Sequence, residues 1–480
     1  MSVQLFNTLS GKKETVKPGR GKQLKLFVCG PTVYDHSHIG HARTYIFFDF
    51  LVKYLRSQGL DVFYLQNITN IDDRIIKRAR EEKKNPLRLA DFFTKEYLKD
   101  MKMLGVDAVD AYAPATKFIP AIVHQVETLI KKGYAYKVEN DGYYFDISRF
   151  SDYGKLSKRT VEQAEDSVSR IDESVQKKNR GDFALWKLAH PNSAIQMRPS
   201  EYYKVKVING EPLWNTRLGW GRPGWHIEDT AISEHYFGPQ YDIHGGGLDL
   251  KFPHHEAEIA QQEAASGEKP FVKIWMHTGF LTINGKKMSK SLKNFITIKS
   301  FLEKNEAKML RLMVFQHHYR SPMNYNEKLL ESARNTWSNI KLFMDKLDFF
   351  INYRKSNGGG IPDAYLQESN LFEVALSDDM NTPVALSLIF NVMNNYNEML
   401  SVKDHASLVK ARNSIKEKLL LFGILPSAPK IPSKIKDLFE KREKYRGNKQ
   451  FIQSDALRQK LNALGYVVED TSFGSFISPK

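Results

Sequence analysis

The sequence predicts an α/β protein: a parallel sheet split by an insertion, followed by a helical region and a small C-terminal unit. Between residues 24 and 110, short apolar runs alternate with helical patterns, and the alternation returns between 219 and 290. Beyond residue 300, apolar residues at helical spacing replace the strand patterns. These changes along the chain predict the order of its parts.

The first half of the predicted sheet begins with Leu24–Cys29, an apolar run of the length expected for a buried parallel strand. A Gly30-Pro31 turn follows, and the apolar residues after His38 keep helical spacing. Val62–Asn67 has the pattern of the next strand. A strand–helix–strand unit makes its strands parallel, and ligands bind at the carboxyl ends of such strands.

An insertion is predicted at residues 111–215, where short aromatic strands such as Gly142–Phe145 mix with charged segments. The strand and helix alternation resumes near Tyr241–His244. We therefore expect residues 1–110 and 216–300 to be the two halves of one Rossmann-type, nucleotide-binding catalytic domain.

Two further parts follow the predicted catalytic domain. Residues 301–425 are predicted to be helical, because apolar positions recur at helical spacing and strand patterns are few. Gly423–Pro432 contains three prolines and is typical of a linker. Residues 433–480 then form a small unit that begins with many lysines and arginines.

The composition favours a polyanionic partner. The 480 residues include 71 Lys and Arg against 55 Asp and Glu, a formal net charge of +16, which suits an RNA backbone. The single cysteine excludes an intramolecular disulfide and a Cys-x-x-Cys zinc knuckle. We find neither a run of membrane-spanning length nor a signal-peptide pattern, so we expect a cytoplasmic protein with no membrane partner.

The motif His38-Ile39-Gly40-His41 lies at the start of the predicted helix after the first strand. A helix N-terminus offers backbone N–H donors and a positive dipole end to a polyphosphate. His38 and His41 can donate hydrogen bonds to phosphate oxygens, and Gly40 lets a nucleotide approach the backbone. Taken alone the motif is weak, because similar residues occur at ordinary helix starts.

A lysine-rich loop, Gly285–Ser291, lies far along the chain and contains Lys287 and Lys290. Ammonium groups on a mobile loop can follow a departing pyrophosphate and close on the transition state. A Lys/Ser loop alone is usually a solvated turn. The order and separation of this loop and the His38–His41 motif together predict an ATP site.

Three residues suggest a metal site. Cys29 ends the first predicted strand, and His254 and Glu258 lie four residues apart, so a helix presents both on one face. A thiolate, an imidazole and a carboxylate supply three ligands of a tetrahedral zinc site. A buried cysteine is more often an apolar filler, and a pair at this spacing is more often a surface contact, so the residues alone leave the question open.

Taken together, the motifs resemble the cysteinyl-tRNA synthetases, which are class I aminoacyl-tRNA synthetases, over nearly the whole chain. The residues that carry the resemblance are Cys29-Gly30-Pro31-Thr32-Val33-Tyr34, His38–His41, Asn67-Ile68-Thr69, Gly224–Glu228, Asp242–Gly247, Phe252–Glu256 and Lys287–Ser291. The resemblance implies a ligase that activates L-cysteine with ATP and Mg²⁺ to cysteinyl-adenylate and transfers it to tRNA(Cys). It also implies one zinc ion per chain, which binds the substrate thiol. We expect a monomer.

The resemblance implies four sets of site residues. The catalytic residues are His38, His41, Lys287 and Lys290. The ATP-binding residues are Gly40, His244, Gly245 and Lys290. The substrate-binding residues are Gly30, Thr32, Thr69 and Trp225. The metal ligands are Cys29, Asp229, His254 and Glu258.

Asp229 departs from the pattern, because these synthetases usually have a second cysteine ligand at this position. The formal ligand charge is unchanged, but a carboxylate is harder than a thiolate, and a zinc–oxygen bond is about 2.1 Å against about 2.3 Å for zinc–sulfur. We hypothesise a Cys-Asp-His-Glu site that holds zinc less tightly than a site with two thiolates.

Two other functions fit part of the pattern. The cysteine:glucosaminyl-inositol ligases share the adenylating core, but they lack a long C-terminal RNA-binding part. A paralogue that binds tRNA without catalysis fits if Asp229 spoils the metal site. Cysteine-dependent ATP–pyrophosphate exchange separates a catalyst from a binder, and the product formed separates the two enzymes.

Overall fold

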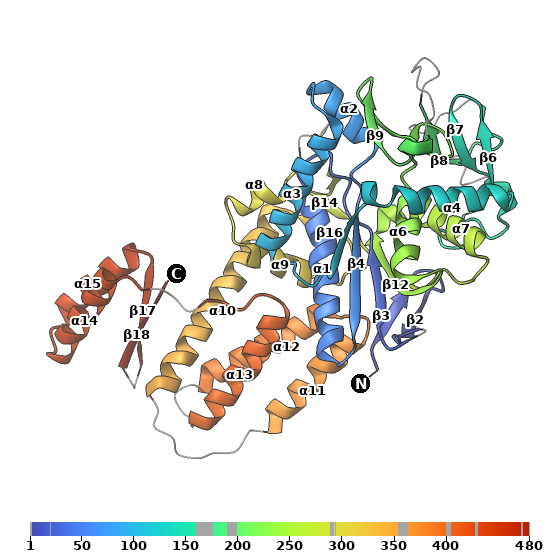
Figure 1. Ribbon diagram of the computed structural model, residues 1–480. Helices are drawn as coiled ribbons and strands as arrows, with labels where there is room; N and C mark the ends of the chain where they lie inside the picture. The colour runs from blue at the N-terminus through green and yellow to red at the C-terminus, as the bar shows by residue number, and fades with distance from the viewer. Residues whose placement is uncertain are drawn as a thin grey trace. The chain divides into compact units, whose positions relative to one another are not determined.

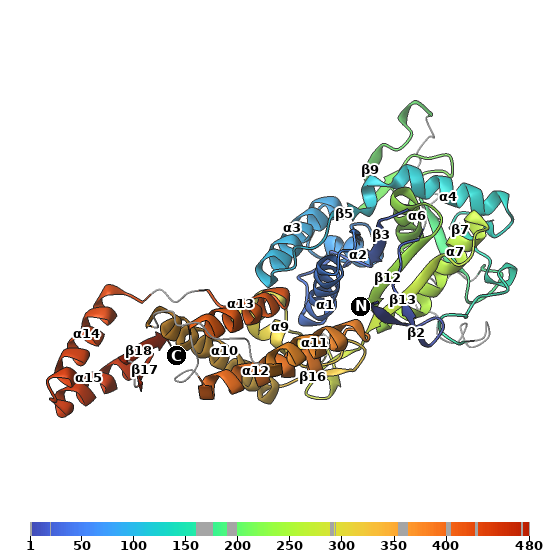
Figure 2. The same cartoon turned by 90° about the horizontal axis from the view of Figure 1, so that it is seen from below.

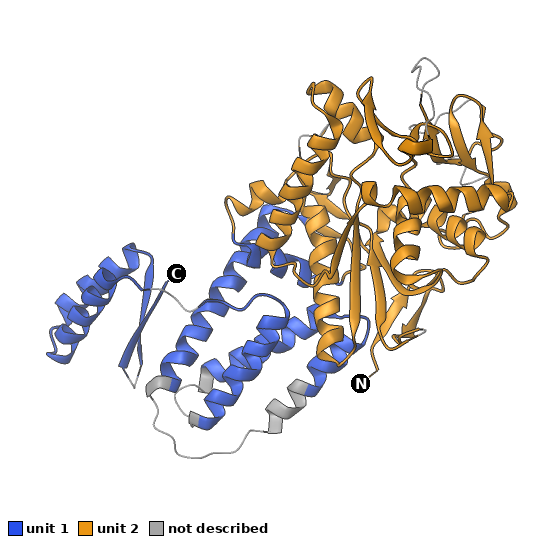
Figure 3. Ribbon diagram, viewed as in Figure 1, with its two compact units in different colours: residues 1, 306–318, 325–480 blue, residues 2–305, 319–324 orange. Residues whose placement is uncertain are grey.

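A computed structural model describes residues 2–19, 21–159, 176–189, 199–288, 292, 294–353, 363–399, 405–427, 431–471 and 474–479 (Figure 1). The chain divides into two compact units (Figure 3). One unit contains residues 2–305 and 319–324, and the other contains residues 306–318 and 325–480. In the part of the chain that the structure describes, no helix is long and apolar enough to span a membrane.

A five-stranded parallel sheet forms the centre of the first unit. Its strand order is β13 (Val272–Thr278), β12 (Tyr241–Gly247), β3 (Leu24–Val28), β4 (Val62–Ile68) and β5 (Ala111–Pro114). Every neighbouring pair is parallel. Because β3 pairs with β12, segments from before and after the insertion share one sheet, which confirms the predicted split α/β fold.

Helices cover both faces of this sheet (Figure 2). One face carries α1 (Ile39–Ser57) and α3 (Pro86–Leu104), and the other carries α4 (Ile119–Lys131), α6 (Ile227–Phe237) and α7 (Glu256–Ser266). The helix α2 (Asp73–Glu81) follows the carboxyl end of β4 and packs on α3. The helix α1 is buried over most of its length because its apolar residues pack on the sheet. This two-sided cover buries almost every residue of β4 and β12.

The insertion is a six-stranded antiparallel sheet. Its order is β6 (Ala135–Val138), β7 (Gly142–Phe145), β8 (Phe183–Leu188), β11 (Gly221–Pro223), β10 (Glu211–Trp214) and β9 (Val205–Ile208). Its bounds differ from the expected 111–215: β5 belongs to the parallel sheet, and β11 pairs with β8 in the insertion. The apolar pattern did not reveal these partners, because backbone pairing rather than side-chain periodicity decides them.

Smaller elements complete the first unit. They are the hairpin β1 (Gln4–Asn7) and β2 (Lys12–Thr15), the helix α8 (Ile298–Leu302), and the strands β14 (Leu281–Ile283), β15 (Lys286–Lys287) and β16 (Met323–Tyr325). The order of the last three strands is β15-β14-β16. Lys287 therefore lies in the edge strand of the β14–β15 hairpin and is exposed.

The second unit is mostly helical, as the sequence predicts. Its helices are α9 (Ala307–Phe315), α10 (Glu327–Tyr353), α11 (Asp363–Ser377), α12 (Thr382–Met399), α13 (His405–Leu421), α14 (Ser433–Gly447) and α15 (Phe451–Ala463). A hairpin, β17 (Tyr466–Thr471) and β18 (Gly474–Pro479), follows α15. Arg442 is fully buried and binds both carboxylate oxygens of Asp470, at 2.6 and 2.8 Å, which ties α14 to this hairpin.

Candidate active site

His38 and His41 cap the N-terminus of α1 reciprocally. His38 Nδ1 accepts a hydrogen bond from the backbone N–H of His41 at 3.2 Å, and His41 Nδ1 accepts one from the backbone N–H of His38 at 3.4 Å. The two rings stack with their centroids 3.7 Å apart. The capping box therefore fixes both imidazoles at the end of the helix where the sequence predicts a phosphate site.

Burial sets the protonation of these two histidines. It lowers the pKa of His38 to about 4 and that of His41 well below its usual value. Both rings are therefore neutral at pH 7. Since each Nδ1 accepts a hydrogen bond from the backbone, each proton resides on Nε2, which leaves two N–H donors for a ligand at the helix N-terminus.

The fold brings the lysine-rich loop to the His38–His41 motif. The backbone of Ile39 donates a hydrogen bond to Ile296 at 3.1 Å, and that of Ile298 donates to Ser37 at 2.8 Å. A Cβ atom added at Gly40 would lie 3.4 Å from Met288 Cε. The lysine-rich loop therefore lies beside the His38–His41 motif, as predicted, as far along the loop as Met288. Ser289, Lys290 and Ser291 lie outside the described residues.

Four side chains of the predicted metal set converge at the carboxyl ends of β3 and β12. They are Cys29, Asp229, His254 and Glu258, and their ligand atoms all lie within 4.8 Å of one another. His254 Nε2 lies 3.0 Å from Asp229 Oδ2 and 2.9 Å from Glu258 Oε1. Cys29 Sγ lies 3.8 Å from the same Glu258 oxygen. These separations are close to the distances between ligands in a tetrahedral zinc site.

The secondary structure explains why these side chains meet. Cys29 directly follows β3, and Asp229 lies in the first turn of α6. His254 lies in the wide turn Lys251–His255, which leads into α7, where Glu258 is in the first turn. The spacing of four residues therefore places His254 and Glu258 side by side, as the sequence indicates.

The electrostatics of the set favour a bound cation. Burial opposes protonation of His254, but the carboxylates of Glu258 and Asp229 outweigh it and raise the pKa of His254 to about 10. Burial raises the pKa of the Cys29 thiol, and the two carboxylates raise it further. Glu258 Oε2 is buried without a hydrogen-bond partner. Three acidic groups around one imidazole fit a divalent ion, and sulfur, nitrogen and oxygen donors together suit zinc.

Further side chains hold the ligands in place. The Asn67 amide donates a hydrogen bond to Asp229 Oδ1, and His226 Nδ1 lies 2.8 Å from His254 Nδ1. The Trp225 ring stacks on the His254 ring, with centroids 4.6 Å apart and an interplanar angle of 6°. Such partners fix the orientation and basicity of metal ligands.

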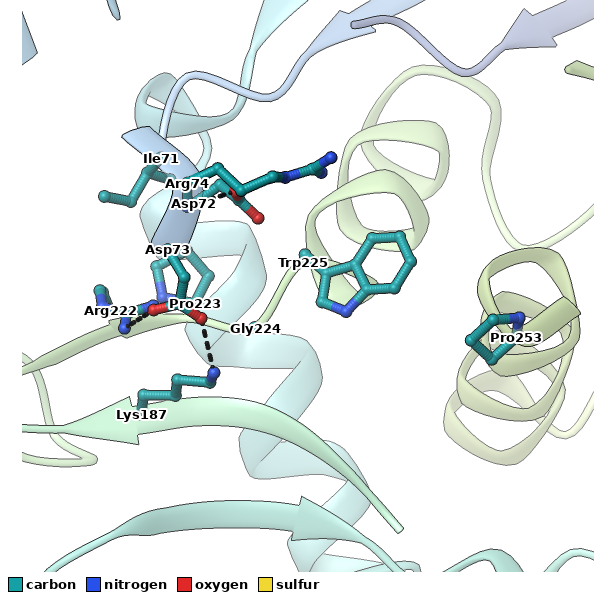
Figure 4. A pocket seen from close by; sticks show the side chains of 10 residues that line it. All are labelled: Ile71, Asp72, Asp73, Arg74, Lys187, Arg222, Pro223, Gly224, Trp225 and Pro253. Atoms are coloured by element: carbon teal, nitrogen blue, oxygen red, sulfur yellow. Dashed lines mark hydrogen bonds and ion pairs between the residues drawn. The ribbon is translucent and has the colours of Figure 1, made fainter. Parts of the chain in front are cut away.

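A cavity of about 180 Å³ adjoins the metal set (Figure 4). Trp225 lines this cavity together with Ile71, Asp72, Asp73, Arg74, Lys187, Arg222, Pro223, Gly224 and Pro253. Because Trp225 also stacks on His254, the cavity lies next to the predicted metal set. It contains both cationic and anionic side chains, which suits a zwitterionic substrate.

The other predicted substrate residues lie on β3 and β4 or just beyond them. Thr32 and Thr69 form a parallel bridge. Thr32 Oγ1 accepts a hydrogen bond from Arg74 at 3.0 Å, and the Thr69 hydroxyl donates to Glu228. At Gly30, an added Cβ would lie 1.7 Å from the Asn67 carbonyl oxygen, so only glycine fits there.

His244 and Gly245, both predicted to bind ATP, lie on β12 near the metal set. His244 is fully buried, with Nε2 3.2 Å from Cys29 Sγ. A Cβ at Gly245 would lie 2.3 Å from the Phe48 ring, so this glycine permits packing between α1 and the sheet. The structure therefore groups His244 with Cys29 rather than with His38 and His41.

Sequence reasoning missed several residues that surround the metal set. His255 Nε2 lies 3.2 Å from Cys29 Sγ, and Arg74 lines the Trp225 cavity. His226 and His277 contact the ring nitrogens of His254 and His255. A signal existed, because histidines recur at the ends of the predicted strands and beside glycine-rich turns.

Family models match most of the chain. The model for the class I tRNA synthetase (C) catalytic domain matches residues 15–335. The DALR domain model matches residues 371–426, and the model for the cysteinyl-tRNA ligase anticodon binding domain matches residues 428–474.

Similar proteins align over almost the full chain. The cysteine–tRNA ligase of Methanococcus maripaludis strain C7 is 42% identical over 98% of this chain and 97% of its own length. That of Coxiella burnetii strain RSA 493 is 40% identical over 99% of both. Among solved structures, Mycobacterium tuberculosis methionyl-tRNA synthetase in complex with methionyl-adenylate shares the fold, with a TM-score of 0.59 and 14% identity over 84% of this chain and 90% of that chain. The chain therefore belongs to the cysteine–tRNA ligase family of class I aminoacyl-tRNA synthetases.

Proposed function

We propose that this chain activates L-cysteine with ATP and transfers the cysteinyl group to tRNA(Cys). One observation carries the proposal: Cys29, Asp229, His254 and Glu258 converge beside the Trp225 cavity, at the carboxyl end of β3, the strand that leads to His38. A metal site that binds a thiolate, next to a site that binds phosphate, suits the formation of an adenylate from cysteine and ATP. Family membership supports the same substrates.

In the first step, the cysteine carboxylate attacks the α-phosphorus of ATP, which gives cysteinyl-adenylate and pyrophosphate. The Nε2–H groups of His38 and His41 donate hydrogen bonds to phosphate oxygens as negative charge develops on them. Lys287 and Lys290 follow the pyrophosphate, and Mg²⁺ accompanies the ATP phosphates. In the second step, a terminal ribose hydroxyl of the tRNA attacks the cysteinyl carbonyl carbon, the bond from that carbon to the phosphate oxygen breaks, and AMP leaves.

Cys29, Asp229, His254 and Glu258 would hold a zinc ion. When bound, zinc supplies a soft Lewis acid that prefers the substrate thiolate to a serine hydroxyl of nearly the same size. Trp225 stacks on His254 and lines the cavity from which the substrate would approach. If this site rejects serine, a separate domain that hydrolyses wrongly attached serine would be unnecessary.

The second unit would bind the tRNA. The basic helix α14 carries exposed Lys434, Lys436, Lys441 and Lys444, which can contact RNA phosphates. Matches of the DALR and anticodon-binding models to residues 371–426 and 428–474 support this role. They also favour tRNA over an amino sugar as the acceptor. We expect a cytoplasmic monomer.

Cysteine-dependent ATP–pyrophosphate exchange tests the proposal. We expect exchange with cysteine and exchange at least 10³-fold weaker with serine at equal concentration. Charging of tRNA(Cys) should follow, with no product from glucosaminyl-inositol. A protein that binds tRNA(Cys) but shows no exchange would be the non-catalytic paralogue, and condensation onto the amino sugar would establish the other ligase.

A further inference from the structure

Two sets of metal-ligating side chains overlap in the first unit. The outer set is Cys29, Asp229, His254 and Glu258, which the proposed function uses. The inner set is Cys29, His244, His255 and Glu258, and its ligand atoms also lie within 4.8 Å of one another. All members of both sets are buried. The two sets share Cys29 and Glu258 and differ in their other two ligands.

We propose that the inner set is a second position for the same ion, so that one zinc-type cation occupies either of two overlapping sites. The proposal rests on the proposed zinc function, and it adds His244 and His255 as ligands. We expect a single ion, because Cys29 and Glu258 belong to both sets and cannot coordinate an ion at the inner site and another at the outer site at the same time.

The geometry of the inner set suits a tetrahedral ion. Cys29 Sγ lies 3.2 Å from His244 Nε2, 3.2 Å from His255 Nε2 and 3.8 Å from Glu258 Oε1. Zinc–sulfur bonds of about 2.3 Å and zinc–nitrogen bonds of about 2.0–2.1 Å place sulfur and nitrogen about 3.5 Å apart. Small shifts therefore bring these donors to ligand spacing.

The second nitrogen of each imidazole is already engaged. His255 Nδ1 lies 2.8 Å from His277 Nε2, and His277 Nδ1 lies 2.9 Å from the Thr8 hydroxyl. His244 Nδ1 lies 2.5 Å from the Tyr241 hydroxyl and 3.5 Å from Glu258 Oε2. Metal-bound histidines usually donate their other N–H to such a partner, which leaves Nε2 as the ligand. Both Nε2 atoms here face Cys29.

The types of donor atom explain why the inner set can compete with the outer set for zinc in this chain. The outer set offers one sulfur, one nitrogen and two carboxylate oxygens, whereas the inner set offers one sulfur, two nitrogens and one carboxylate oxygen. Zinc favours imidazole and thiolate ligands. Because Asp229 is a hard ligand, it lowers the zinc affinity of the outer set and so reduces the difference in affinity between the two sets.

The position of Trp225 gives the two sites different access. Trp225 lines the cavity and stacks on His254, so a substrate thiol reaches the outer set. His244 and His255 have no exposed surface. Cysteine binding should therefore draw the ion from the inner to the outer position.

The first test removes the outer ligands with the double variant D229A/H254Q. Zn²⁺ content and X-ray absorption are measured on the full chain, with near-UV circular dichroism to verify the fold. We expect about one Zn²⁺ per chain, with one sulfur and two imidazole nitrogens in its shell. A folded variant without zinc, beside a wild type that binds it, would overturn the inner position alone. A wild type without stoichiometric zinc would overturn the proposed zinc function as well.

The second test keeps the outer set and changes one inner ligand in H255Q. The probe is Co²⁺, whose visible absorption reports its ligands. We expect the wild-type spectrum to change when cysteine is added, and the resting H255Q spectrum to differ from that of the wild type. H124Q is the matched control, because His124 is exposed on α4, and it should behave as wild type. Identical spectra for H255Q and wild type, with and without cysteine, would refute the proposal.

Discussion

The carboxylate of Asp229 and the imidazole of His254 lie 3.0 Å apart, and the contact uses Nε2, the same nitrogen that faces Glu258. Asp229 thus points its oxygen to the place where a metal ligand is needed. The Asn67 amide binds the other Asp229 oxygen and holds it there. Asp229 can therefore serve as the fourth donor of the proposed zinc set, as a harder ligand than a thiolate.

Asp229→Cys should strengthen zinc binding, and Asp229→Asn should weaken it. A second thiolate is a better zinc ligand than a carboxylate, whereas an amide is neutral and poorer. We expect at least a tenfold change in affinity in each direction, about 1.4 kcal/mol. Competition with a chromogenic chelator measures it. Equal affinities for wild type and both variants would show that position 229 does not touch the ion.

His38→Asn should remove a phosphate donor while keeping the helix cap. Asparagine caps helices well, but it cannot supply the Nε2–H of His38. The rate of cysteine-dependent pyrophosphate exchange should fall about 10²–10³-fold with little change in melting temperature. His38→Ala is the comparison, because it also loses the cap and should cost about 1 kcal/mol of stability. A His38→Asn enzyme with wild-type exchange would exclude His38 from catalysis.

Asp100→Asn should stabilise the first unit in a pH-dependent way. Burial raises the pKa of Asp100 to about 6, with Glu96 adding to the effect, and its Oδ2 has no hydrogen-bond partner. The folded state therefore disfavours the charged form, so stability is lost as pH rises from about 4 to about 6. Above pH 6 the variant should gain about 1–3 kcal/mol in free energy of unfolding. Below pH 4 it should gain nothing.

Urea unfolding of Asp100→Asn at pH 4, 5, 6 and 7.5, with wild type in parallel, measures this gain. Asp91→Asn is the control, because Asp91 is exposed on the same helix and pairs with Lys95 at the surface. That variant should stay within about 0.5 kcal/mol of wild type at every pH. If the gain in free energy of unfolding for Asp100→Asn does not depend on pH, the gain does not come from removing the buried charge of Asp100.

Arg442→Gln should unfold or loosen residues 433–479 without changing cysteine activation. The buried guanidinium binds both oxygens of Asp470 and the Ser475 hydroxyl, so its loss leaves a carboxylate without its main partner. Asp470 is partly exposed and keeps Arg446 and Ser475 as partners, so the loss of Arg442 should cost about 1.5–3 kcal/mol. Hydrogen exchange should show faster exchange in α14 and β17, and the KM for tRNA should rise while pyrophosphate exchange is unaffected.

Arg446→Gln is the control for this pair, because Arg446 binds the same Asp470 from an exposed position. Its loss should cost less than about 1 kcal/mol. Equal effects of the two variants on hydrogen exchange would show that the buried Arg442 stabilises this region no more than the exposed Arg446 does.

Much of the fold was predictable, because local patterns carry it. The apolar runs of β3 and β4 and the helical spacing of α1 each reflect burial within one segment. The short strands β5 and β11 were not placed correctly. Each has three or four residues, and its sheet is chosen by the partner rather than by its own side chains.

The sequence by itself determined which residue types the candidate site contains: a histidine pair at a helix start, a lysine-rich loop, and a cysteine, histidine and glutamate at positions predicted for metal ligands. These follow from residue types and from spacings within one helix turn. Only the tertiary structure decided that His244 and His255 face Cys29, that Trp225 joins the cavity to the metal ligands, and that Met288 reaches Gly40. The physical reason is that distances between residues far apart in the chain are set by strand pairing and packing of the whole sheet, which no local spacing encodes.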